Sequence, residues 1–197
     1  MTKNLLPIAL DLEGRACLVV GSGTELEARA LSLAELGAVV SVVSEQPSEA
    51  LLKLAKARGL HVEQRAFDAS DVDGTWLVVI ASDDPALVEA VTRAAEQRRV
   101  HYCAVDRPTR GSFSHMALAR AGSLVIAVST AGSAPALSRR LREELERLLG
   151  EANMERFVKK LSELRERTPA GRRRELLGRA VEAVRFTGRI ELPERGD

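Results

Sequence analysis

The first residues of this chain that could do chemistry are two glycines separated by a serine, Gly21-Ser22-Gly23. They follow an apolar run at 16–20 and precede a helical pattern, and a second apolar run at 39–43 leads to Glu45. The first glycine permits a tight turn, and the second lets the backbone approach a pyrophosphate at a helix N-terminus. An acid about 20 residues further on binds the adenosine ribose hydroxyls in such units. The pattern therefore predicts a dinucleotide site.

One position departs from the dinucleotide pattern. The third small residue of the G-x-G-x-x-G/A motif is replaced by Leu26, where the helix and the first strand pack closely. We expect this side chain to push the helix away from the strand and to weaken NAD binding. The alternative is a Rossmann-like fold whose glycine turn binds nothing.

Strand-like and helix-like segments alternate beyond the glycine turn. Residues 61–67, 76–81 and 100–105 are predicted strands, and 84–98 is a predicted helix opened by Asp83-Asp84-Pro85. Repeated β-α-β order indicates a parallel sheet with right-handed crossovers. We therefore predict an α/β fold: a Rossmann-type NAD-binding domain at 1–112, a small dimerisation segment at 113–150 around a strand at 123–129, and a helical C-terminal domain at 151–197.

In open α/β sheets, ligands bind beyond the carboxyl ends of the strands. The residues that follow the predicted first, second and fourth strands are therefore the cofactor candidates. They are Gly21, Ser22, Gly23, Thr24, Glu25, Glu45, Gln46, Ser82 and Asp83. Glu45 would repel a 2′-phosphate, which favours NAD over NADP.

Asp106 follows the predicted fifth strand and opens a loop that carries Arg107 and Arg110. A carboxylate in a crevice can serve as a general base, with a pKa set by burial and nearby cations. The alternative is that Asp106 caps the loop or pairs with one of the two arginines. His115, a few residues later, lies where it can enter the same cleft.

Composition limits the class of protein. The chain of 197 residues has 45% hydrophobic and 29% charged residues, which is typical of a globular domain with a full core. A net charge of +1 argues against a general nucleic-acid or membrane binder. The N-terminal segment lacks the features of a signal peptide, and Cys17 and Cys103 are expected to be core thiols. We expect a cytoplasmic protein with no metal cluster.

A set of short segments is spread over nearly the whole chain. They are Leu6-Pro7, Gly21-Ser22-Gly23, Gly37-Ala38, Trp76-Leu77-Val78, Ser82-Asp83-Asp84, Val105-Asp106-Arg107-Pro108, Phe113, the run from Ala127 to Pro135, and Leu141-Arg142. Together they resemble a known family, the precorrin-2 dehydrogenase and sirohydrochlorin ferrochelatase module of siroheme synthase. The pairing of the loop around Asp106 with a later Ser-Thr-x-Gly segment is the most specific part of the resemblance.

The resemblance implies NAD-dependent oxidation of precorrin-2 to sirohydrochlorin, and some members also insert ferrous iron. It implies that Asp106 accepts protons in both steps and that the protein is a homodimer sharing contacts around 123–149. The substrate is a polycarboxylate, for which the expected contacts are Arg107, Arg110, His115, Ser129 and Thr130.

The chain departs from the family pattern at Leu26, Val88, Cys103 and Met116. These positions lie near the expected cofactor and substrate loop, while Asp106 is retained. Two alternatives to a dehydrogenase follow from this: a chelatase that needs no nicotinamide, and a non-catalytic tetrapyrrole- or nucleotide-binding protein on the same scaffold.

Overall fold

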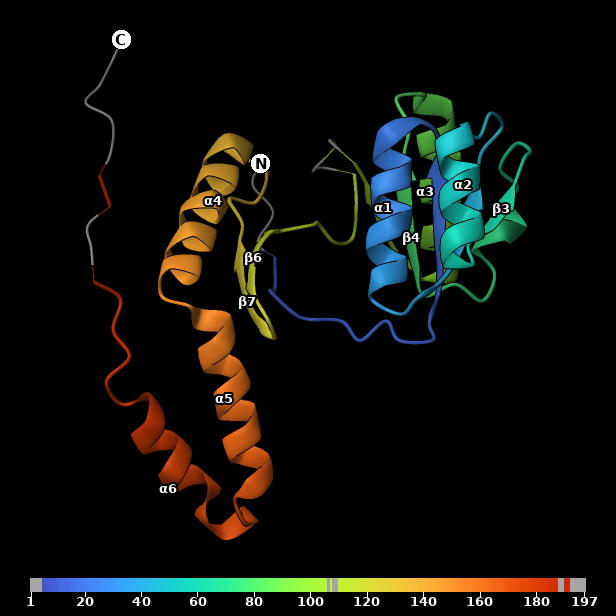
Figure 1. The fold of residues 1–197 in the computed structure, drawn as a ribbon. Helices are drawn as coiled ribbons and strands as arrows, with labels where there is room; N and C mark the ends of the chain where they lie inside the picture. The colour runs from blue at the N-terminus through green and yellow to red at the C-terminus, as the bar shows by residue number, and fades with distance from the viewer. Residues whose placement is uncertain (1–4, 106, 108–109, 188–189, 192–197) are drawn as a thin grey trace. The chain divides into compact units, whose positions relative to one another are not determined.

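The computed structural model describes residues 5–105, 107, 110–187 and 190–191, and Asp106 lies outside them. The chain divides into two compact units (Figure 1). The first contains residues 1–115 and 130–135, and the second contains 116–129 and 136–197.

A five-stranded parallel sheet forms the centre of the first unit. The spatial order of its strands is β3-β2-β1-β4-β5, the Rossmann order, so the predicted α/β fold is confirmed. The strands are β1 (Ala16–Gly21), β2 (Val39–Val43), β3 (His61–Glu63), β4 (Leu77–Ala81) and β5 (His101–Ala104). All four strand pairs are parallel.

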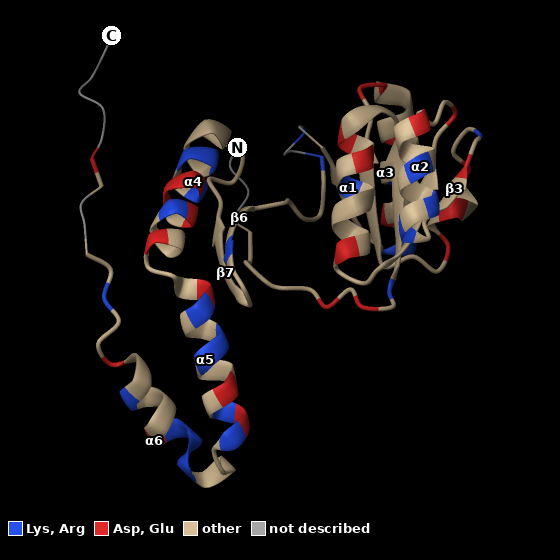
Figure 2. Cartoon of the chain, in the orientation of Figure 1, with Lys and Arg blue, Asp and Glu red and all other residues tan. Residues whose placement is uncertain are grey.

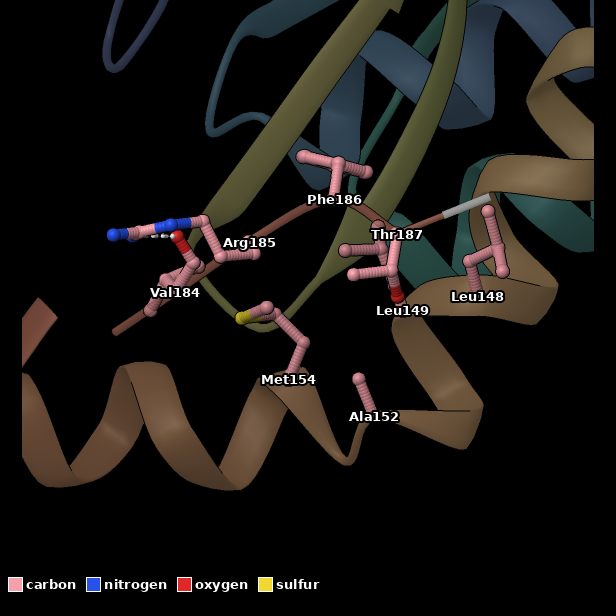
Figure 3. Close-up of a pocket in the computed structure, with 8 residues that line it drawn as sticks. All are labelled: Leu148, Leu149, Ala152, Met154, Val184, Arg185, Phe186 and Thr187. Carbon is pink, nitrogen blue, oxygen red and sulfur yellow. Dashed lines mark hydrogen bonds between the residues drawn. The ribbon is translucent and has the colours of Figure 1, made fainter. Parts of the chain in front are cut away.

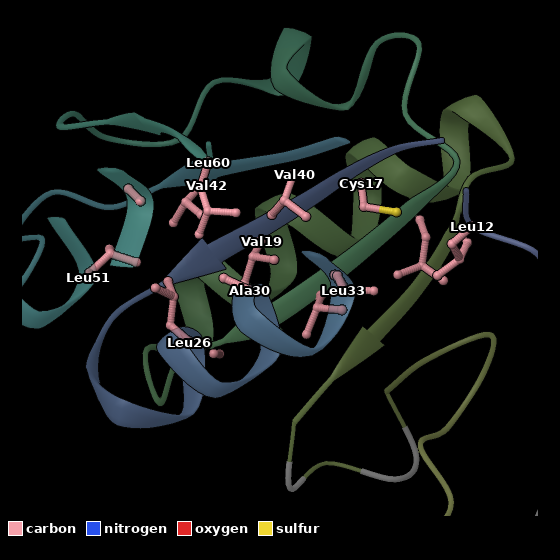
Figure 4. Packing of buried hydrophobic residues seen from close by; sticks show 14 residues of the cluster. Leu12, Cys17, Val19, Leu26, Ala30, Leu33, Val40, Val42, Leu51 and Leu60 are labelled. Carbon is pink, nitrogen blue, oxygen red and sulfur yellow. The ribbon is translucent and has the colours of Figure 1, made fainter. Parts of the chain in front are cut away.

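Alternation along the strands divides the core between the two faces of the sheet. Val19 and its neighbours in the alternate register pack under α1 (Gly23–Glu35) and α2 (Glu49–Arg58). Leu18 and Val20 face α3 (Pro85–Arg98) and the short 3₁₀ helix η1 (Ala69–Val72). Figure 4 shows Leu26, Ala30 and Leu33 of α1 beside the strand residues Val19, Val40 and Val42.

The third strand is shorter than the predicted 61–67, because the chain leaves the sheet after Glu63. Arg65 explains the departure: its guanidinium turns to Glu63 and to Asp71, which is in η1. The carboxylate of Asp71 also accepts the backbone N–H of Asp68 at 2.8 Å. Charged side chains thus replace ladder hydrogen bonds along this segment.

Replacement of Asp71 by Asn is expected to cost about 1–2 kcal/mol of unfolding free energy, because Asp71 is mostly buried and bidentate to Arg65, at 2.6 and 2.9 Å. The hydrogen bonds from Arg65 lower the pKa of Asp71 below its unfolded value. Its contribution is therefore complete above that unfolded value and disappears as the pH falls through the folded pKa.

Urea unfolding of both proteins over a falling series of pH values measures this effect, and the difference should shrink as the pH falls through the folded pKa of Asp71. Glu49→Gln is the matched control, because Glu49 forms an exposed pair with Lys53 and should cost less than about 0.5 kcal/mol. If Asp71→Asn stayed equally less stable than the wild type in acid, the loss of unfolding free energy would come from the shape of the side chain rather than from its charge.

The second unit begins with an antiparallel hairpin of β6 (Ala117–Ala121) and β7 (Leu124–Val128), joined at Gly122 with φ of 59°. A strand was expected at 123–129, and β7 occupies most of that range. Its antiparallel pairing with a preceding strand was not expected. The sequence of β6, Ala-Leu-Ala-Arg-Ala, has high helix propensity, so this strand was not predicted. Pairing with β7 overrides that propensity in the structure.

Three helices complete the second unit: α4 (Pro135–Glu151), α5 (Met154–Arg167) and α6 (Ala170–Val181). A small core of Ala119, Ala121 and Leu149 joins the hairpin to α4, and Met154 of α5 packs against it. Thr168-Pro169 separates α5 from α6. Figure 2 shows positive and negative residues interleaved along α4 and α5. On α4, Arg140 and Arg142 pair with glutamates one turn away, as on a solvated helix face.

Candidate functional site

The turns after β1, β2 and β4 lie at one edge of the sheet, where the strands end. Gly21 at the end of β1 is in register with Ala81 at the end of β4, and the N–H of Ser22 donates to the carbonyl of Ala81 at 3.0 Å. Chain order alone predicted this convergence of polar residues. It forms the switch point at which α/β sheets bind ligands.

The two glycines of the turn have different roles. Gly21 has φ of +134°, and a Cβ there would lie 1.9 Å from the carbonyl oxygen of Ala81. Gly23 has φ of +82°, but a Cβ there would meet no atom within 4 Å. The first glycine therefore allows β1 and β4 to approach, and the second faces open space at the start of α1.

The N-terminus of α1 has no side-chain cap. Ser22 is the N-cap residue, yet its side chain accepts no hydrogen bond from the helix. The N–H groups of the first turn have no partner within the helix, and they carry the positive end of its dipole. Ser22, Gly23 and Thr24 are exposed, whereas the carboxylate of Glu25 pairs with Arg29 at 2.5 Å. The backbone here suits an anion such as a pyrophosphate.

A buried hydroxyl group lies at the end of β2. Ser44 is 3% exposed and its N–H donates to the carbonyl of Glu63, so the extended backbone continues to this residue. Among the described residues, its hydroxyl has no hydrogen-bond partner. Glu45 and Gln46 follow and are exposed. An unpaired hydroxyl, exposed polar groups and the open space over Gly23 fit a dinucleotide at this edge.

Ser44→Ala is expected to leave the unfolding free energy of the ligand-free protein unchanged or to raise it. An unsatisfied buried hydroxyl costs about 1–3 kcal/mol, and the methyl side chain removes that cost. Urea unfolding measures the change. Thr92→Val in α3 is the matched control, because Thr92 is also buried with an unpartnered hydroxyl. A loss above about 1 kcal/mol in Ser44→Ala alone would show that the hydroxyl is already paired.

The turn after β4 caps α3. The hydroxyl oxygen of Ser82 accepts the N–H of Asp84 at 3.1 Å, and the Asp84 carboxylate accepts the N–H of Ala86 at 2.9 Å. The side chain of Asp83 is exposed, while its carbonyl accepts a hydrogen bond from Arg107 at 2.8 Å. Ser82 therefore has a structural partner besides its expected role toward the cofactor.

The segment after β5 carries the remaining loop residues. The N–H of Val105 donates to the carbonyl of Ile80, so pairing with β4 continues up to the position before Asp106. Asp106 itself, the expected catalytic residue, lies outside the described residues. Arg107 and Arg110 both bond to the region around α3: Arg107 contacts the Asp83 carbonyl, and Arg110 contacts the carboxylate of Glu89.

His115 packs against Phe113, with ring centroids 5.4 Å apart and planes at 74°. Phe113 in turn contacts the core under α1. Although His115 keeps exposed surface, loss of water around the ring and the charge of Arg29 lower its pKa to about 4. The imidazole is therefore neutral at pH 7, and the charges that act on it come from α1.

Leu26 fills the core beneath α1. It is 1% exposed and belongs to the cluster that contains Val19 and Ala30 (Figure 4). The close contact between helix and sheet is therefore made through this side chain. Weak NAD binding caused by Leu26 stays a prediction.

Leu26→Ala is expected to lower the unfolding free energy by about 2–5 kcal/mol, because a buried leucine is replaced by a cavity. Urea unfolding measures the loss. Leu36→Ala is the control, since Leu36 follows the same helix and is 46% exposed. Equal losses in the two variants would show that α1 closes over the space left at position 26.

The other expected substrate contacts lie in the segment that leads to α4. Thr130 accepts the N–H of Ala134 through its hydroxyl oxygen at 3.1 Å, and Ser133 bonds back to the carbonyl of Thr130. Ser129 belongs to the second unit and Thr130 to the first.

The second unit also contains a small apolar pocket of about 140 Å³ (Figure 3). It is formed by the junction of α4 and α5 and by the chain after α6. The residues that line it are Leu148, Leu149, Ala152, Met154, Val184, Arg185, Phe186 and Thr187. Apart from Arg185 and Thr187, the lining offers no polar side chain to orient a substrate.

The described residues contain neither a metal cluster nor a membrane-spanning helix. Within the described ranges, no group of His, Cys, Asp and Glu side chains could hold a metal ion. No helix in the described part of the chain has both the length and the apolar character needed to span a bilayer.

Two residues of this region were not expected from the sequence, Ser44 and Glu89. Ser44 could have been identified from the sequence, since it is the polar residue that ends an apolar strand at the carboxyl edge. Glu89 could not, because nothing in the helix pattern connects it to a loop 21 residues away.

Comparison with protein families gives two matches. Residues 8–117 match the family described as "Putative NAD(P)-binding", which covers more than half of the chain. Residues 122–148 match the family described as the sirohaem biosynthesis protein central domain.

Curated relatives include siroheme synthase 2 of Cronobacter sakazakii, 40% identical over 144 residues, and siroheme synthase of Citrobacter koseri, 39% identical over the same length. These alignments cover 73% of this chain and 32% of each relative, so the chain matches about a third of their length. Among solved structures, SirC, a precorrin-2 dehydrogenase, is similar with a TM-score of 0.79 and 26% identity, covering 91% of this chain and 90% of that one. The chain therefore belongs to the family described as "Putative NAD(P)-binding".

Proposed function

We propose that this protein oxidises precorrin-2 to sirohydrochlorin with NAD⁺ as the acceptor. The observation that carries the proposal is the glycine turn. The N-terminus of α1 has no side-chain cap, and a Cβ at Gly23 would meet open space. Gly21 lets the buried strands β1 and β4 approach each other beside it. The family membership and the similarity to a precorrin-2 dehydrogenase support it. In the reaction, precorrin-2 loses a hydride to NAD⁺ and a proton to a base, so the products are sirohydrochlorin, NADH and H⁺.

The residues at the carboxyl edge of the sheet would hold the cofactor, which supplies a hydride acceptor when bound. The N–H groups of Gly23 and Thr24 would bind the pyrophosphate. Glu45 and Gln46 would bind the adenosine ribose and disfavour a 2′-phosphate. The remaining proposed cofactor contacts are Gly21, Ser22, Glu25, Ser82 and Asp83.

Asp106 would take the proton, because it is the next residue in the chain after Val105, whose N–H still pairs with β4. A polycarboxylate substrate calls for cationic and hydroxyl partners. The proposed contacts are Arg107, Arg110, His115, Ser129 and Thr130. His115 would act as a neutral hydrogen-bonding group, since its pKa of about 4 leaves it uncharged at pH 7.

We also propose that the protein is a cytoplasmic homodimer and that ferrous iron is a second substrate. The support for these statements is the family resemblance, in which some members insert iron after the oxidation. Iron is then a substrate that meets the tetrapyrrole, not a resident cofactor.

The test of the proposal is incubation of the purified protein with precorrin-2 in three arms: with NAD⁺, without NAD⁺, and with ferrous iron after the oxidation. Sirohydrochlorin absorption should appear only in the arms that contain NAD⁺. If iron is inserted, siroheme absorption should replace it. An absence of sirohydrochlorin, together with metal insertion into added sirohydrochlorin, would instead indicate the chelatase alternative.

A further inference from the structure

The carboxylate of Glu89 joins α3 to the loop after β5. It accepts a hydrogen bond from Arg110, 21 residues further along the chain. It also lies 3.6 Å from the guanidinium of Arg93, one turn later on the same helix. The hydrogen bond from Arg110, followed by the charges of Arg110 and Arg93, lowers the pKa of Glu89, so the carboxylate is ionised at neutral pH.

The backbone of Arg110 is fixed independently of this ion pair. Its carbonyl accepts the N–H of Ala104 at 3.0 Å, and the next pair of bonds joins Ser112 to Tyr102. Gly111 between them has no room for a side chain, since a Cβ would lie 3.0 Å from the carbonyl oxygen of Phe113. These hydrogen bonds therefore hold the backbone of Arg110 in place, and the ion pair with Glu89 orients its side chain.

Arg110 keeps donors for a second anion. Its contact with Glu89 uses the Nη1 group, and its side chain is 51% exposed. Arginine has five N–H donors in a planar fork, so one carboxylate does not satisfy it. Two positive charges, from Arg93 and Arg110, meet the single negative charge of Glu89. This group retains a positive charge beside the loop that follows β5.

We propose that Glu89 is a positioning residue that holds Arg110 ready for a carboxylate of the substrate. This inference rests on the proposed function and on the role proposed for Arg110. A held side chain loses less rotamer entropy when substrate arrives, so the substrate binds more tightly. A competing role predicts the opposite effect. If Glu89 only competed with the substrate for Arg110, its removal would strengthen substrate binding.

The test compares the wild type with four variants: Glu89→Gln, Arg110→Gln, the double variant and Arg93→Gln. For each protein, steady-state kinetics give KM for precorrin-2 and kcat. Equilibrium titrations give Kd for NAD and Kd for added sirohydrochlorin. An exposed pair is worth about 0.2–1 kcal/mol, so Glu89→Gln should raise KM and the sirohydrochlorin Kd about 1.5- to fivefold. Arg110→Gln should raise them at least as much, and the double variant no further. The values of kcat and of Kd for NAD should stay unchanged. Arg93→Gln is the control, because Arg93 contacts the same carboxylate from outside the loop.

A lower KM in Glu89→Gln would overturn the inference in favour of competition. An unchanged KM in Glu89→Gln or in Arg110→Gln would also overturn it, because one residue would then be irrelevant to substrate. Sirohydrochlorin binding separates this result from failure of the proposed function. If the wild type binds sirohydrochlorin without oxidising precorrin-2, and Glu89→Gln weakens that binding, the oxidation proposal fails and the positioning role stands. If the wild type neither turns over nor binds, both fail.

Discussion

Gly21→Ala is expected to remove at least about 3 kcal/mol of unfolding free energy and to leave little folded protein. A Cβ at Gly21 would lie 1.9 Å from the carbonyl oxygen of Ala81, and both atoms belong to the paired central strands β1 and β4. Neither strand can move without disturbing its other neighbour. The backbone at Gly21, with φ of +134°, is also one that side chains rarely adopt. For a domain stable by about 5–15 kcal/mol, such a loss is severe.

Soluble yield, circular dichroism and urea unfolding measure this loss. Gly23→Ala is the matched control: its φ of +82° is strained, but the new Cβ would meet open space. We expect Gly23→Ala to fold with a loss of about 1–2 kcal/mol and to weaken NAD binding. If Gly21→Ala were as stable as Gly23→Ala, the close approach of β1 to β4 at this turn would be wrong.

Asp106→Asn is expected to lower kcat for precorrin-2 oxidation by about 10²–10⁴-fold, because the amide keeps the shape of the side chain but cannot take a proton. The melting temperature and the Kd for NAD should stay near those of the wild type. Stopped-flow or steady-state rates at saturating NAD⁺ measure the effect. Activity within a few-fold of the wild type would show that Asp106 is a loop cap rather than the base.

Much of the fold follows from local patterns in the sequence. The central strands β1, β2 and β4 are mainly apolar runs, and the β-α-β order requires parallel pairing. The start of α3 was predictable because Asp84 and Pro85 form a cap and a first turn, which the structure contains. Buried cysteines were likewise expected, and both Cys17 and Cys103 are buried.

Other features depend on contacts that a linear pattern does not contain. The strand β6 was missed because its alanines favour a helix until β7 pairs with them. The end of β3 is set by Arg65 reaching Asp71, a side-chain contact that strand propensity does not report. Leu26 was interpreted from a motif, whereas its burial under α1 depends on the shape of the surrounding core.

The same division holds for the candidate site. Residues at the ends of strands could be placed on one edge from chain order, since parallel strands end together. The partners of those residues could not: Glu89 reaches Arg110 across 21 residues, and the unpaired hydroxyl of Ser44 is visible only once its neighbours are in place. Sequence reasoning thus located the edge, and the contacts within it came from the structure.

The most direct test of the central claim is a reaction with limiting precorrin-2 and excess NAD⁺, in which NADH and sirohydrochlorin are followed together. If the glycine turn holds the hydride acceptor for this oxidation, the two products should appear at the same rate and one NADH should form for each sirohydrochlorin. The Gly23→Ala variant should slow both products equally. Sirohydrochlorin formed without NADH, or formed at the same rate when NAD⁺ is omitted, would contradict the account.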